Sequence, residues 1–139
     1  MSAFSPLTWP PNFDRASRTE RFLRDVPLVG LNSRVRKNIQ SQMEARLGSD
    51  YAAVWQPFEV DLSVRDRVSE MICASFQWPN PFYSPADPCE ILLWDCSGVM
   101  TNVRFLIELE ACFNIELTEN DTQGTYFNLV YICAQGPRP

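Results

Sequence analysis

The chain has 139 residues, 45% hydrophobic and 21% charged, which is typical of a soluble globular protein. It contains no histidine, and this excludes Ser-His and Cys-His dyads and zinc sites with histidine ligands. The net charge is −5, but residues 1–60 carry eight Lys/Arg and six Asp/Glu, whereas residues 61–139 carry four and eleven. This acidic C-terminal part favours a basic protein partner and disfavours nucleic acid and anionic lipid; alternatively, it only keeps the protein soluble.

The N-terminal 60 residues predict one clear helix. Residues 1–20 are expected either to form an extended arm anchored by Trp9 or to fray, and a short helix is predicted near residues 18–25. The stretch NSRVRKNIQSQMEARLGSD predicts a helix with Ser33 as its N-cap and Gly48 as its stop. Apolar residues recur there at four-residue intervals, at Val35, Ile39, Met43 and Leu47. The charged residues of the other faces are expected in solvent: Arg34, Arg36, Lys37, Glu44 and Arg46.

A second helix is predicted over SVRDRVSEMICASFQW, residues 63–78, after an apolar connector, YAAVWQPFEVDL. Ser63 and Asp66 resemble a capping box at its start, and Pro79 marks its end. One apolar face is expected, made of Val64, Val68, Met71, Ile72 and Phe76.

A long loop is predicted over residues 77–96. A loop of this length inside a compact domain needs a functional or structural reason. It is expected to pack down onto the protein because it is rich in apolar residues: Trp78, Phe82, Tyr83, Ile91, Leu92, Leu93 and Trp94.

Two further helices complete the prediction. VMTNVRFLIELEACF, residues 99–113, predicts a helix whose apolar side is Val99, Val103, Leu106, Leu109 and Phe113, widened by Ile107. TENDTQ can form at most one helical turn, and TYFNLVYICAQG predicts a last helix between Thr125 and Gly136. No stretch predicts a strand, so the expected class is all-α.

The five cysteines, at positions 73, 89, 96, 112 and 133, are odd in number and form no C-x-x-C pair. Cys73, Cys112 and Cys133 fall within apolar helical patterns, where free cysteine behaves as a small hydrophobe. We expect all five to be reduced and the protein to be cytoplasmic. No signal-peptide or membrane-spanning apolar run is expected, and no metal site is predicted.

The segment VRFLIELEACFNIELTEND resembles the second helix and following loop of the acyl and peptidyl carrier protein family. There, an apolar-acidic helix containing LE..F leads into IEI or IEL and an acidic turn. DRVSEMICASF is similar to the family's first helix, and TYFNLVYICAQ to its last. The resemblance covers residues 61–135 and implies an acyl-carrier-protein-like four-helix bundle. Residues 1–60 would be an N-terminal helical extension, and residues 136–139 a tail.

The resemblance implies a non-enzymatic module that carries acyl groups on 4'-phosphopantetheine, attached to a serine where the second helix begins. Counting from the first helix places the attachment at Ser97, and counting back from LELEACF places it at Val99. Asp95 precedes Ser97 by two positions, and Gly98 stands where the family usually has leucine. A helix N-terminus suits a phosphodiester because its amides are unpaired and its dipole favours anions.

The resemblance also implies partners, namely acyl-handling enzymes and a phosphopantetheinyl transferase. These would dock on an acidic face that Arg104 interrupts: Glu108, Glu110, Glu116 and Glu119, with Asp121. The alternative is a degenerate carrier-like domain that binds a protein partner without a prosthetic group. In that case Ser97 and Asp95 are helix-cap or turn residues. Cys96 could be a reactive thiol, but no histidine can act as its base.

Overall fold

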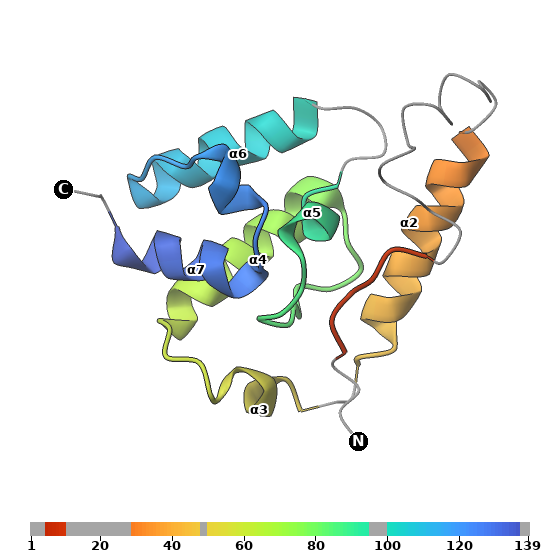
Figure 1. Cartoon of the computed structure of the whole chain (residues 1–139), viewed down its shortest axis with the longest axis horizontal. Helices are drawn as coiled ribbons and strands as arrows, with labels where there is room; N and C mark the ends of the chain where they lie inside the picture. Colours follow the sequence, from red (N-terminus) through yellow and green to blue (C-terminus); the bar gives the residue numbers. More distant parts are fainter. Residues whose placement is uncertain (1–4, 11–28, 48–49, 95–99, 137–139) are drawn as a thin grey trace.

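The computed structural model describes residues 5–10, 29–47, 50–94 and 100–136, except for the side chains of residues 29–33 and 100. These ranges contain six α-helices and a 3-10 helix and no strand, so the predicted all-α class is confirmed (Figure 1). The predicted helix at residues 18–25 and the tail from residue 137 lie outside the described residues. The elements are α2 (Val29–Glu44), α3 (Tyr51–Trp55), α4 (Leu62–Phe76), α5 (Cys89–Leu92), α6 (Met100–Phe113), η2 (Glu119–Thr122) and α7 (Tyr126–Gln135).

Helix α4 is central, and it packs against both α6 and α7 (Figure 1). Its residues Val68, Ile72 and Phe76 are buried, as the apolar face predicted. The Phe76 ring meets Phe105 of α6 edge-on, with 5.4 Å between ring centroids. Toward α7, the Tyr126 hydroxyl hydrogen-bonds with the Ser69 hydroxyl and donates to the Arg65 carbonyl at 3.2 Å. Helix α4 therefore meets α6 through aromatic packing and α7 through hydrogen bonds of Tyr126.

The start of α4 differs from the prediction. The N-cap is Asp61, not Ser63, and its carboxylate accepts bonds from the Ser63 amide (2.9 Å) and hydroxyl (2.6 Å). These bonds lower the pKa of Asp61, because they stabilise the charged carboxylate. Two residues of the predicted connector thus belong to the cap and first turn. Past the last turn, Gln77 takes the left-handed conformation, with φ 56°.

Helix α2 begins and ends earlier than predicted. It starts at Val29, so Ser33 lies within the helix and is not its N-cap. It ends at Glu44 and is followed by a turn, and Gly48 lies outside the described residues. Val35, Ile39 and Met43 are buried as predicted, but Leu47 is 56% exposed because it follows the end of the helix.

Arg46, predicted in solvent, is buried. Its guanidinium forms a bidentate ion pair with Asp87, in which Nη1 lies 2.7 Å from Oδ2 and Nη2 lies 2.5 Å from Oδ1. Both side chains are almost fully excluded from solvent, at 2% and 0% exposure. The prediction was wrong because it assumed a regular helix through Arg46 and could not see a partner 41 residues away.

The connector after residue 50 contains helix α3, which was not predicted. The Asp50 carboxylate caps it by accepting from the Ala53 amide at 3.1 Å. Its last residue, Trp55, is 2% exposed and donates its indole N–H to the Tyr83 carbonyl at 2.8 Å. That bond fastens the connector to the long loop at Trp55.

The long loop is packed onto the protein, which confirms the prediction. Trp78, Tyr83 and Trp94 are buried, whereas Phe82 is 40% exposed. The Trp78 indole N–H donates to the Leu92 carbonyl at 2.9 Å, which closes the loop upon itself. Helix α5 forms within the loop and was not predicted. Four residues are too short for an apolar period to be visible in the sequence.

Helix α6 has the predicted position, and only part of its predicted apolar side is buried. Phe105 and Leu109 are fully buried, whereas Val103 and Ile107 are 47% and 60% exposed. Leu109 is therefore buried as predicted and Phe105 joins it, whereas the predicted Val103 and Ile107 face away from the core. Leu106 and Phe113, at the edges of the buried side, are half-buried. The sequence was ambiguous because apolar residues occur on most sides of this helix.

The C-terminal elements follow the prediction. TENDTQ forms the single turn η2, with Thr118 and Asp121 in a capping box. Helix α7 lies between Thr125 and Gly136, which has φ +72°. The hydrophobic core contains residues of both the 1–60 and 61–135 segments, including Leu7, Ile39, Ile72 and Leu129.

Candidate functional site

The predicted attachment residues, Asp95, Ser97 and Gly98, lie outside the described residues, as do Cys96 and Val99. The described chain ends at Trp94 on one side and resumes at Met100, the first residue of α6, on the other. The Asn102 side-chain amide, in the first turn of α6, donates to the Leu93 carbonyl at 2.8 Å. This bond joins the start of α6 to the end of α5, so both flanks of residues 95–99 are held at one place.

The predicted acidic residues do not form one uniform face. Glu108 is exposed on α6, and Glu116 and Glu119 are exposed after it. Glu110 is half-buried, and its carboxylate accepts a bond from the Leu117 amide at 2.8 Å. Glu110 therefore holds the turn that follows α6. Asp121 belongs to the capping box of η2 and likewise has a local structural contact.

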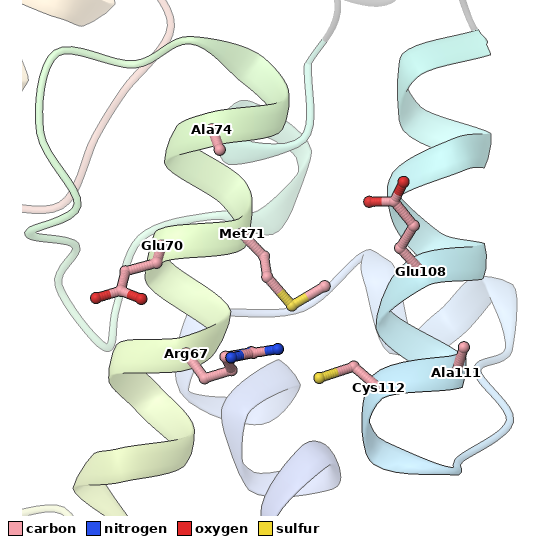
Figure 2. Close-up of a pocket in the computed structure, with 7 residues that line it drawn as sticks. All are labelled: Arg67, Glu70, Met71, Ala74, Glu108, Ala111 and Cys112. Atoms are coloured by element: carbon pink, nitrogen blue, oxygen red, sulfur yellow. The ribbon is translucent and has the colours of Figure 1, made fainter.

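An open groove of about 710 Å³ lies between α4 and α6. Figure 2 shows Met71 of α4 and Cys112 of α6 pointing into the space between these helices, with Arg67 reaching toward Cys112. Glu108 points in from α6. The walls combine apolar atoms with charges of both signs, so the groove suits a side chain or short amphipathic segment: Arg67, Glu70, Met71, Ala74, Glu108, Ala111 and Cys112.

The four described cysteines are free thiols in different surroundings. Burial raises the pKa of Cys89 to about 12 and that of Cys133 to about 12, so both stay protonated at neutral pH. Burial also raises the pKa of Cys73. Cys112 is exposed, although it falls within an apolar helical pattern in which cysteine was expected to behave as a small hydrophobe. In the described part of the chain, no group of three or more His, Cys, Asp or Glu residues could hold a metal ion.

The sequence interpretation missed the residues that bind the N-terminal arm, Gln42, Arg46 and Asp87. One signal was present, namely Asp87 within an apolar, proline-rich loop, where a buried carboxylate requires a partner. The partner itself could not be read from local sequence.

Comparison with protein-family models, curated proteins and solved structures finds no match to this chain. No helix in the described ranges has the length and apolar character needed to cross a membrane.

Proposed function

We propose that the chain is an acyl-carrier-protein-like module, a non-enzymatic protein that carries acyl groups on a 4'-phosphopantetheine arm at Ser97. The observation that carries the proposal is the order of the elements: α4, a long packed loop with α5, α6, the single turn η2, and α7. The resembled family has this order. The packing of α4 against both α6 and α7 is also what a carrier-like bundle requires.

The position of Ser97 supports attachment at this residue. It precedes Met100, the first residue of α6, by three positions. Amides in the first turn of a helix lack intrahelical partners, and the helix dipole favours negative charge there. A phosphodiester on the Ser97 hydroxyl would be stabilised by both effects. Asp95 and Gly98, on either side, are part of the same proposed attachment segment.

Helix α6 is proposed to dock the partner proteins, the phosphopantetheinyl transferase and acyl-handling enzymes. Val103 and Ile107 form an exposed apolar patch on it, and the exposed Glu108 lies on the side of the same helix that lines the groove with α4. An exposed apolar patch with an acidic group on the same helix suits a partner that has an apolar patch and basic residues. Glu116 and Glu119 extend the negative charge beyond the helix.

A second candidate is a carrier-like domain that binds a protein partner and takes no prosthetic group. The exposed Val103 and Ile107 favour it, because a docking surface on α6 needs no modification at Ser97. The two candidates share this surface and differ only in whether the chain carries a phosphopantetheine arm.

Mass spectrometry distinguishes them. The purified chain is incubated with coenzyme A and each of several phosphopantetheinyl transferases, and its intact mass is measured. The carrier function predicts a gain of one phosphopantetheine arm, abolished by Ser97→Ala and retained by Ser41→Ala, a matched change at an exposed serine of α2. No gain with any transferase would reject the carrier function and favour the second candidate. A gain that persists in Ser97→Ala would reject Ser97 as the attachment residue.

A further inference from the structure

Residues 5–10 lie as an extended arm beside α2, drawn in red in Figure 1. Exposure alternates along the arm: Pro6 and Thr8 are exposed, Leu7 is only 1% exposed and Trp9 is half-buried. An alternation of period two is typical of an extended strand with one side against the protein. Leu7 and Trp9 are thus the inward side chains of the arm.

The backbone of the arm is bound by the Gln42 side chain of α2. Its Oε1 accepts from the Thr8 amide at 3.1 Å, and its Nε2 donates to the Thr8 carbonyl at 2.9 Å. The Asn38 side chain, which accepts from the same Nε2 at 2.8 Å, orients the amide. Both bonds go to the main chain of one residue, as between paired strands. The Thr8 side chain plays no part in them.

The buried ion pair makes two more main-chain contacts. Asp87 Oδ1 accepts from the Leu7 amide at 3.0 Å, and Arg46 Nη2 donates to the Ser5 carbonyl at 2.7 Å. The Ser84 amide also donates to Asp87, at 2.8 Å, and further fixes the carboxylate. Charged groups held rigidly in a buried place make strong, directional hydrogen bonds. Four hydrogen bonds therefore reach the arm's main chain from side chains of the protein.

Trp9 provides the side-chain contact at the far end. Its indole N–H donates to Glu90 Oε1 at 3.0 Å. Its ring meets Trp94 edge-on, with 5.6 Å between ring centroids. Since α5 contains Glu90 and Trp94 follows it, the arm connects α2 to the long loop. The polar contact fixes the orientation of the indole, and the ring contact favours an aromatic residue.

We propose that this arm groove, formed by Gln42, Arg46, Asp87, Glu90 and Trp94, is a recognition site for an extended Leu-x-Trp peptide, and that the arm of a second copy of the chain can occupy it. Proteins bind extended peptides through hydrogen bonds to the peptide main chain, which give affinity, and through contacts with alternate side chains, which give specificity. Residues 11–28, between the arm and α2, comprise 18 residues and can span up to about 60 Å. The covalent connection therefore permits exchange of arms between copies.

A chain's own arm competes with any arm supplied by another molecule. A covalent tether gives it an effective concentration of the order of millimolar. The intact chain should therefore bind an added peptide weakly, and weakening its own arm should reveal the site. This inference does not depend on whether Ser97 is modified.

The first test uses the full-length Trp9→Ala variant and a fluorescent peptide of residues 1–13, with binding followed by polarisation. We expect saturable binding at least about tenfold tighter than to the wild-type chain. A peptide with Thr8→Pro should bind up to about tenfold more weakly than one with Thr8→Ala, because proline lacks the N–H that Gln42 accepts. Thr8→Ala should bind like the wild-type peptide, since this side chain is exposed.

A second full-length variant, Leu7→Ala, is measured in parallel in case Trp9→Ala does not fold, and circular dichroism checks the helix content of both. Absence of saturable peptide binding by a folded variant would overturn the proposal. Equal affinities for the Thr8→Pro and Thr8→Ala peptides would also overturn it, because the main-chain bonds would then play no part.

The second test identifies the second copy as the occupant. Trp9→Ala has a weakened arm and an intact groove, whereas Gln42→Ala has an intact arm and a weakened groove. Their equimolar mixture should form a heterodimer in analytical ultracentrifugation that neither variant forms alone. A mixture that stays monomeric at concentrations where the peptide saturates Trp9→Ala would overturn arm exchange between copies.

Discussion

The arm groove and the bundle of α4, α6 and α7 are stabilised by different interactions. In the bundle, apolar side chains such as Ile72, Phe105 and Leu109 are fully buried in one hydrophobic cluster. In the arm groove, a buried ion pair and a side-chain amide bind the main chain of an extended segment. Apolar packing is distributed over many small contacts, whereas a buried charge depends on one partner. The ion pair of the arm groove should therefore be more sensitive to a single substitution than an apolar contact of the bundle.

The largest effect is expected for Asp87→Ala. The substitution removes the carboxylate that pairs with the buried Arg46 guanidinium and accepts bonds from the Leu7 and Ser84 amides. We expect a loss of about 3–5 kcal/mol in the free energy of unfolding, measured with urea. Asp66→Ala is the control, because Asp66, which pairs with Arg65, is 57% exposed. This variant should lose no more than about 1 kcal/mol in the free energy of unfolding. Similar losses from the two variants would refute a special role of the buried pair.

The next effect is expected for Leu109→Ala in the bundle. Leu109 is fully buried, so its truncation leaves a cavity, and we expect a loss of about 2–5 kcal/mol. Ile107→Ala, two residues away on the same helix, should change stability by no more than about 0.5 kcal/mol because Ile107 is 60% exposed. Urea unfolding compares the pair. A larger loss from Ile107→Ala would show that the opposite side of α6 is buried.

A smaller effect concerns the buried thiols of the core. The pKa of Cys133, raised by burial to about 12, lies above the unfolded value near 9. The protonated, buried thiol contributes its full stabilisation to the folded state below about pH 9. This contribution is lost as the pH rises toward the pKa of the thiol in the folded state. The free energy of unfolding should fall there by up to about 1.4 kcal/mol per pH unit for this thiol.

Urea unfolding between about pH 8 and about pH 10 checks this expectation. Cys133→Ala should reduce the slope of stability against pH. Val130→Ala is the matched change in α7, since it truncates another buried side chain without removing a thiol, and it should leave the slope unaltered. Equal slopes in Cys133→Ala and the wild type would contradict the assigned role of this thiol.

The smallest effect is expected for Gln42→Ala. The two hydrogen bonds to Thr8 are exposed to water, so their loss should cost only about 1 kcal/mol of stability. Ser41→Ala, at the preceding exposed position, should change stability by less than about 0.5 kcal/mol. Amide hydrogen exchange at Thr8 should nevertheless speed up in Gln42→Ala and not in Ser41→Ala. Unchanged exchange would mean that Gln42 does not hold the arm.

Patterns within one segment predicted much of the fold. The positions of α4, α6 and α7, the single turn at TENDTQ and the packed loop follow from periodicity, caps and composition, and the structure has them. Short helices were missed, because α3 and α5 have five and four residues and show no period. The cap of α4 was misassigned by two residues, since Asp61 and Ser63 are both good caps.

Among the residues predicted for the candidate site, too, local sequence indicated some features and missed others. Glu108 and Glu116 are exposed as expected, whereas Glu110 binds the Leu117 amide, which the sequence did not indicate. Ser97, Asp95 and Gly98 lie outside the described residues, so attachment there stays a prediction.

By itself, the sequence determined the all-α class and the approximate position of each long helix, because helix periodicity and capping act over a few residues. Tertiary structure decided the rest: the side of α6 that is buried, the burial of Arg46, and the seating of the arm. The contacts responsible join residues far apart in the chain, 41 apart for Arg46 and Asp87 and 80 apart for Leu7 and Asp87. Such a pair is favourable only after the elements have met and excluded water, so no local pattern specifies it.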